Sequence, residues 1–306
     1  YENTRGLQRK IAKGTARIIR ATISRGFNYW HVSFTVYERK RVPETHRNPG
    51  SVVGVDMGVG DHIIVAATPN GDEVMRRGLP TTISDHDKRI RHLQRKMSRK
   101  RGPDKRTKTT PSNRWVRANN QVRKYHNTMA NVRRDLAAKA AHDLARDYAT
   151  VVIEDLNVRA MMVRGGAYKR GLNRAIAQAS FADLRRRITY KTRWNGGTVL
   201  VADRWFPSSK TCSRCGEVKS KLSLSEREYM CYRCGVVVDR DLNAATNLAK
   251  LAVPKSGVST IDRTGSSPGM GRGGAGKTVV SSDAGAPADE ASMVRKDLSG
   301  CKAGTR

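Results

Sequence analysis

Two pairs of cysteines have the spacing of ligands for a single metal ion. Cys212 and Cys215 are separated by two residues, and Cys231 and Cys234 repeat this spacing fifteen residues later. Both thiolates of a C-x-x-C turn can face the same ion, so the pattern predicts a four-cysteine zinc ribbon, with two disulfides as the alternative. Four thiolates complete a tetrahedral site. We therefore expect one structural Zn²⁺ ion that contributes about 10 kcal/mol to local folding.

Three carboxylates stand where apolar runs end or a helical pattern begins. Asp56 and Glu154 each end an apolar run, and Asp241 follows the second cysteine pair. Singly, a strand-end aspartate is typical of a turn, and Asp241 could simply cap its helix. As a set, the three could converge on two Mg²⁺ ions about 4 Å apart, which would clamp a scissile phosphate. Their order alone is a weak signal, because any chain offers many such triples.

Hydrophobic periodicity predicts the elements that would position these groups. Alternation over 17–37 predicts a β-hairpin, and a meander of three further strands follows. The strands expected after the hairpin lie near 52–56, near 62–67, after Gly71, at 150–156 and at 196–205. Helices are expected over 122–144 and through Ile176, Ser180, Leu184 and Ile188, whose spacing suits one helix face. Strands and helices in this order predict an α/β fold.

The charge of the chain is strongly unbalanced. With 59 Lys and Arg against 27 Asp and Glu, the formal net charge is +32. Residues 88–134 alone hold 17 basic residues and one acidic residue, Asp104. This excess favours a face that follows nucleic-acid phosphates over a merely solvated surface. No apolar run approaches the ~20 residues of a membrane helix, and the cysteines suit metal binding in a reducing compartment. We therefore expect a cytoplasmic protein.

Four segments give the sequence a specific resemblance. They are GVDMGV (54–59), VIEDLNV (152–158), VADRWFPSSKTCSRCG (201–216) and CYRCGVVVDRDLNAATNLA (231–249). In these motifs, their order and their spacing, the sequence resembles the TnpB family of transposon-encoded RNA-guided nucleases, which are related to type V CRISPR effectors. The resemblance implies a RuvC-like, RNase H-type nuclease fold with a zinc ribbon inserted before its last catalytic element.

The resemblance also assigns roles to residues. It implies that Asp56, Glu154 and Asp241 are the catalytic residues and the Mg²⁺ ligands, and that neighbouring Asp239 and Asp155 are not. Asn243 and Asn247 follow Asp241 on one face of the expected helix. Trp205 and Lys210 lie in matching segments without an assigned chemistry, and we expect packing from the first and a DNA contact from the second.

The resemblance divides the chain into five parts. Family members carry a helical recognition region inserted in an N-terminal β-barrel, whereas only one hairpin is expected here, so most of that region is predicted to be lacking. The expected parts are 1–48, a remnant of the barrel (wedge) domain; 49–205, the nuclease core with a basic helical insertion at 83–148; 206–238, the zinc ribbon; 239–253, the last nuclease helix; and 254–306, a disordered tail rich in Gly and Ser.

The expected function is Mg²⁺-dependent DNA cleavage directed by a guide RNA. The resemblance implies a protein of an insertion-sequence transposon, with guide RNA from the same mobile element and target DNA as partners, and a place at the nucleoid. A guide-directed DNA-binding regulator, or a truncated, non-autonomous protein without cleavage, is the main alternative. An unguided zinc-ribbon binder and a strand-joining transposase of the DNA recombination class also stay open, as does the oligomeric state. No membrane partner is expected.

Overall fold

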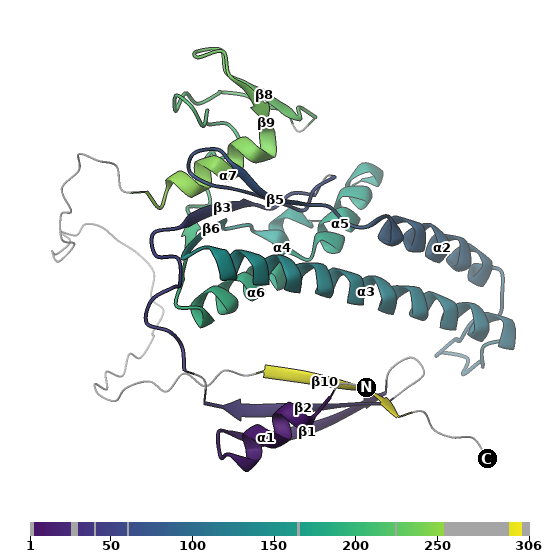
Figure 1. Ribbon diagram of the computed structural model, residues 1–306. Helices are drawn as coiled ribbons and strands as arrows, with labels where there is room; N and C mark the ends of the chain where they lie inside the picture. The colour runs from purple at the N-terminus through teal and green to yellow at the C-terminus, as the bar shows by residue number, and fades with distance from the viewer. Residues whose placement is uncertain are drawn as a thin grey trace, which may run out of the picture. The chain divides into compact units, whose positions relative to one another are not determined.

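The computed structural model describes residues 3–25, 30–39, 41–59, 61–163, 166–223, 225–253 and 294–301 (Figure 1). The described residues fall into two compact units. One unit is drawn from 1–41 and 255–306, and the other from 42–254. All of the predicted site residues belong to the second unit. Among the described helices, none combines the length and apolar character that crossing a membrane requires.

The first unit contains the predicted hairpin. Strand β1 (Ala16–Arg25) pairs antiparallel with β2 (Trp30–Glu38), which confirms the hairpin expected at 17–37. Helix α1 (Arg5–Ala12) precedes it, and a small core forms from Leu7, Ala16 and Val36. The wider barrel remains a prediction, because the described residues of this unit form one three-stranded sheet.

The third strand of that sheet differs from the expected disordered tail. Val294–Cys301 forms β10, which pairs antiparallel with β2. The free edge of a hairpin presents unpaired N–H and C=O groups, and these can pair with a segment of almost any composition. The structure thus describes one strand within the predicted tail, whose disorder stays a prediction. Residues 254–293 and 302–306 of the predicted tail lie outside the described residues.

The second unit is built on a mixed five-stranded sheet in the order β5-β4-β3-β6-β7. Strands β3 (Val52–Asp56), β4 (Ile64–Ala67) and β5 (Glu73–Arg77) form the predicted antiparallel meander. Strands β6 (Thr150–Glu154) and β7 (Thr198–Ala202) add in parallel to β3. Parallel neighbours end at the same edge of a sheet, so Asp56 and Glu154, the last residues of β3 and β6, come to adjacent positions.

Helices cover both faces of this sheet. On one face the long helix α3 (Asn113–Asp147), with α5 (Ala167–Ala179) and α6 (Phe181–Trp194), closes the main core. On the other face lies α7 (Arg240–Lys250), as Figure 1 shows, with Ala245 against β4 and Leu248 against β6. A mixed α/β fold is thus confirmed.

Contact between α7 and β3 depends on a glycine. A Cβ atom added to Gly54 would lie 2.1 Å from the backbone oxygen of Ala245 and 2.3 Å from the backbone nitrogen of Ala249. Real Cβ atoms do not approach other atoms so closely, so only glycine permits this backbone-to-backbone packing. The strand that carries Asp56 is therefore seated directly against the helix that carries Asp241.

One predicted helix is two helices in the structure. Residues 167–194 bend at Ser180, whose φ of 53° and ψ of 40° lie in the left-handed region, so α5 ends there and α6 begins. Ile176, Leu184 and Ile188 are nevertheless all buried in the main core. The apolar spacing stays in phase across the break, and periodicity alone therefore predicted a single helix.

The remaining elements form a helical hairpin and a small ribbon. Helix α2 (Thr81–Ser98) packs along α3 through a separate cluster of Ile83, Ile90, Val122 and Met129, within the predicted basic insertion. The short helix α4 (Val158–Met161) follows β6. Strand β8 (Glu228–Met230) directly precedes the second cysteine pair, β9 (Val237–Asp239) lies between that pair and α7, and the two strands pair antiparallel.

Candidate active site and metal centre

The four cysteines converge on one point. Their Sγ atoms all lie within 4.8 Å of one another, and the Cys212–Cys234 and Cys215–Cys231 sulfur distances are each 3.6 Å. A zinc–sulfur bond of about 2.3 Å implies sulfur separations of about 3.8 Å in a tetrahedron. The donor set and its size therefore fit one Zn²⁺ ion, and the four cysteines are free of disulfides.

Backbone geometry prepares each cysteine pair for the metal. Gly216 and Gly235 follow the knuckles with φ of 78° and 69°, a region that favours glycine, and their N–H groups bond Cys212 and Cys231 oxygens. The backbone N–H of Cys234 lowers the pKa of the Cys231 thiol to about 6, which favours the thiolate form that binds metal.

Asp56 lies in the electrostatic field of the other two predicted carboxylates. Asp56 is buried at 8% exposure, and its burial together with the charges of Glu154 and Asp241 raises its pKa well above the usual value. Burial also raises the pKa values of Glu154 and Asp241. For Glu154, a 2.6 Å hydrogen bond from the Ser208 hydroxyl opposes this increase. Like charges held together under partial burial create a site that a cation would stabilise.

These carboxylates are spaced more widely than the thiolates. Across the described residues, only the cysteines bring three or more candidate ligand atoms within 4.8 Å of one another. Two ions about 4 Å apart need ligands that are spread more widely than the ligands of one ion. The three carboxylates thus differ from the cysteines in spacing, and their oxygen donors suit a hard cation such as Mg²⁺.

Asp239 and Asp241 have different surroundings. Asp239 is the N-cap of α7: its Oδ1 accepts a 2.9 Å hydrogen bond from the Leu242 backbone nitrogen, and Arg76 lies 3.1 Å from the same oxygen. Burial raises the pKa of Asp239, but the bond from Arg76 and the helix N–H groups outweigh it and lower the pKa overall. Asp239 is thus engaged in capping, whereas burial and the charge of Asp239 raise the pKa of Asp241.

Neighbouring residues of the predicted motifs serve other roles. Asp155 pairs with Arg185 at 2.9 Å and with Arg204 at 2.5 Å, and these bonds lower its pKa. The Lys210 ammonium donates to the Ser220 carbonyl at 3.0 Å. The packing role expected for Trp205 is wrong within the described chain, because this residue is 84% exposed.

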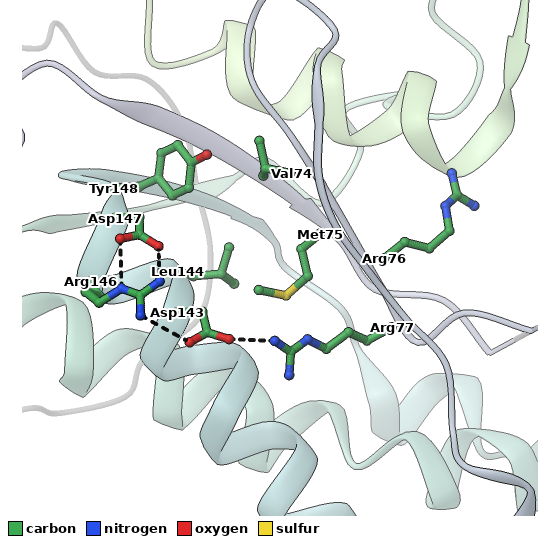
Figure 2. A pocket seen from close by; sticks show the side chains of 9 residues that line it. All are labelled: Val74, Met75, Arg76, Arg77, Asp143, Leu144, Arg146, Asp147 and Tyr148. Atoms are coloured by element: carbon green, nitrogen blue, oxygen red, sulfur yellow. Dashed lines mark hydrogen bonds and ion pairs between the residues drawn. The ribbon is translucent and has the colours of Figure 1, made fainter.

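A cavity of about 410 Å³ lies between β5 and the end of α3 (Figure 2). Its acidic groups are already paired with arginines: Arg77 contacts Asp143 at 2.5 Å, and Arg146 contacts Asp147 at 2.7 Å. Arg76 points away from these pairs in Figure 2 and instead reaches Asp239. The two adjacent arginines of β5 therefore anchor different helices, Arg77 holding α3 and Arg76 holding the start of α7.

Two of these partners were not predicted from the sequence. Ser208 lies in a segment that carried the family resemblance, but its bond to Glu154 spans 54 positions and left no local signal. Arg76 is one of many arginines, and its pairing with Asp239 spans 163 positions. Only the folded chain brings these residues to the carboxylates.

Two family profiles match the chain. Residues 34–164 match the family described as "Probable transposase" (OrfB of IS605), and residues 181–248 match the family described as "Cas12f1-like, TNB domain". Between them they include all three carboxylates and all four cysteines.

Named relatives and a solved structure are also similar. A "Putative RNA-guided DNA endonuclease" of Mycobacterium tuberculosis is 33% identical over 95% of this chain, and the chain spans 62% of that relative's length. A "TnpB-like protein" of Acanthamoeba polyphaga mimivirus is 34% identical over 48% of this chain and 28% of its own. The cryo-EM structure of a Cas12f1–sgRNA–target DNA complex matches 74% of this chain and 55% of its own at 20% identity, with a TM-score of 0.41. The family profiles and the named relatives confirm the resemblance predicted from the sequence.

Proposed function

Since the chain is a relative of the TnpB family, we propose that it is an RNA-guided, Mg²⁺-dependent DNA endonuclease of an insertion-sequence transposon. The observation that carries this proposal is the set of Asp56, Glu154 and Asp241, whose pKa values are all raised in one part of the second unit. The sheet order, an antiparallel meander followed by two parallel strands, supports a RuvC-like, RNase H-type core.

In the proposed site the chain supplies oxygen ligands at fixed positions. Asp56 and Glu154 project from the ends of adjacent strands, and Asp241 projects from the first turn of α7. When bound, a pair of Mg²⁺ ions supplies Lewis-acid chemistry, lowering the pKa of attacking water and stabilising charge on the departing 3′ oxygen. Ser208 holds Glu154 in one orientation, and Arg76 keeps Asp239 away from the ligand set. The zinc centre is structural in this scheme, because its four thiolates leave no position for substrate.

The proposed partners, guide RNA and target DNA, are polyanions that suit the basic hairpin of α2 and α3. A groove of about 410 Å³ between these helices is lined by Lys88, Arg89, His92, Lys96 and Tyr125 among others, with no carboxylate in its lining. Such a groove can follow a phosphate backbone without reading bases, while pairing between guide and target reads the sequence.

The test begins with purification of the chain under conditions that retain bound nucleic acid. We expect an RNA with a defined end, and cleavage, in Mg²⁺, of duplex DNA complementary to the variable end of the recovered RNA. Asp56→Ala, Glu154→Ala and Asp241→Ala should each lower cleavage by at least about 1,000-fold while nucleic-acid binding is kept.

Asp239→Asn is the matched control, because asparagine also caps helices well and should leave cleavage within a few-fold. Loss of cleavage in Asp239→Asn with full activity in Asp241→Ala would show that the wrong aspartate has been assigned. RNA-directed binding without any cleavage by the wild-type chain would instead favour the binding-only regulator.

A further inference from the structure

The segment Pro207–Ser213 connects the zinc centre to the carboxylates. Near its start it contains Ser208, which is 5% exposed, and near its end it contains Cys212, the first expected zinc ligand. The Ser208 hydroxyl donates a 2.6 Å hydrogen bond to Oε1 of Glu154. A carboxylate that accepts such a bond is restricted to one orientation, so Ser208 fixes the side chain of Glu154.

Two buried asparagines of α7 hold the same segment. Asn247 donates from Nδ2 to the carbonyl oxygens of Ser208 at 2.8 Å and Thr211 at 2.7 Å. Asn243 donates from Nδ2 to Thr211 at 2.7 Å, and its Oδ1 accepts from the Ser213 nitrogen at 2.8 Å. Both residues are buried: Asn243 is 0% exposed and Asn247 is 5% exposed. A buried amide lowers stability unless its polar atoms are hydrogen-bonded.

These bonds join three parts of the molecule at one point. Asn243 and Asn247 follow Asp241 in the same helix, α7, so the helix that presents Asp241 also holds the segment. The segment in turn carries the hydroxyl that orients Glu154 and leads directly into the knuckle of Cys212 and Cys215. A shift of the knuckle would therefore move the hydroxyl that orients Glu154 and act on the helix that carries Asp241.

We propose that Ser208, Asn243 and Asn247 are positioning residues through which the zinc-bound knuckle sets Glu154 and Asp241 for divalent-cation binding. The inference rests on the proposed function only in taking these carboxylates as cation ligands. It assigns the zinc ribbon a role beyond its own folding, because the ribbon's geometry is transmitted to the carboxylate site. Partners of metal ligands commonly alter metal affinity about 10- to 100-fold when they are removed.

The test measures cation binding directly on the full, zinc-loaded chain without nucleic acid. Mn²⁺, which accepts the same oxygen ligands as Mg²⁺, is titrated and the free ion is followed by electron paramagnetic resonance. We expect Ser208→Ala to weaken Mn²⁺ binding about tenfold with zinc kept at one ion per chain, and Ser208→Thr to restore most of the affinity. The adjacent Ser209→Ala is the matched control, because Ser209 takes no part in these bonds, and it should bind as the wild type does.

A second variant tests the link to the helix. Asn247→Ala changes neither the carboxylates nor Ser208 chemically, but it removes the bonds that hold the segment of Ser208. We expect it to weaken Mn²⁺ binding about tenfold with zinc still bound. Wild-type affinity in both Ser208→Ala and Asn247→Ala would overturn the positioning role, as would an equal loss in Ser209→Ala. Absence of Mn²⁺ binding by the wild-type chain, or unchanged binding in Asp56→Ala, would overturn the proposed carboxylate site itself.

Discussion

Replacing Gly54 with alanine should separate the strand that carries Asp56 from the helix that carries Asp241. The added Cβ would lie 2.1 Å from the Ala245 backbone oxygen, whereas an ordinary contact begins near 3.4 Å. The helix would therefore have to retreat by about 1.3 Å, the difference between these two distances. Both atoms that the Cβ meets most closely are backbone atoms of α7, so no side-chain rotation relieves the contact.

The expected cost follows from the packing beneath α7. Leu248 and Ala249 are fully buried, and a retreat of the helix loosens their contacts with the sheet. Overpacking against backbone should cost about 3 kcal/mol, which lowers the melting temperature of a unit this size by roughly 6–12 °C. Cleavage should fall more than stability suggests, since a displacement of about 1 Å in a catalytic group can cost roughly 100-fold in rate.

Thermal unfolding and single-turnover cleavage together check this reasoning. Gly171→Ala is the matched control, because nothing lies within 4 Å of its added Cβ and it sits in α5 without a positive φ. That variant should be neutral or more stable by up to about 1 kcal/mol, with unchanged cleavage. A Gly54→Ala protein with wild-type melting temperature and rate would refute the argument that these two backbones must touch.

Three further predictions concern charge and metal. In buffer without divalent ions beyond the bound zinc, Asp56→Asn should raise the melting temperature. The pKa of Asp56 is higher in the folded than in the unfolded protein, so the wild type loses stability as the pH rises from about 4 through the folded-state pKa. The gain should grow from about pH 5.5 to about pH 8 in scanning fluorimetry and shrink when Mg²⁺ is added; a less stable variant at the higher pH would contradict it. Elemental analysis should find one zinc ion per chain, with Cys215→Ser losing the ion and unfolding the ribbon, and zinc-free folded protein would argue against the tetrahedral site. Nucleic-acid affinity should fall steeply with salt, and Lys88→Ala with Lys96→Ala should reduce the log–log slope by about 2 in filter binding, whereas an unchanged slope would place this face in solvent.

The sequence was informative wherever local geometry imposes a pattern. Alternation of apolar residues follows from the two-residue repeat of a strand, and β1 to β4 were found where it predicted them. The zinc centre was predictable for a similar reason, since C-x-x-C spacing is itself the geometry of the knuckle. The same local reasoning suggested Asp241 as a cap at the start of α7, whereas the structure gives that role to Asp239.

What the sequence could not supply is set by contacts between distant residues. The break at Ser180 was hidden because Ile176 and Leu184 stay in phase on either side of it. The bond between Ser208 and Glu154 needs the fold to bring a loop to a strand end. The tight approach at Gly54 likewise appears only when α7 is seated, since a glycine in a strand pattern indicates a close neighbour without saying which one.

The position of α7 also determines when the three carboxylates can come together during synthesis. Until α7 emerges, the sheet face beneath it, including Val65, Ala67 and Val152, has no cover, and Asp56 and Glu154 stand without Asp241. A growing chain therefore cannot bring the three carboxylates together before α7 is made and packs on the sheet. A product that stops within the ribbon keeps its basic hairpin, but it has an exposed apolar face that invites proteolysis. The order of elements along the chain thus delays assembly of the three carboxylates until α7 is made.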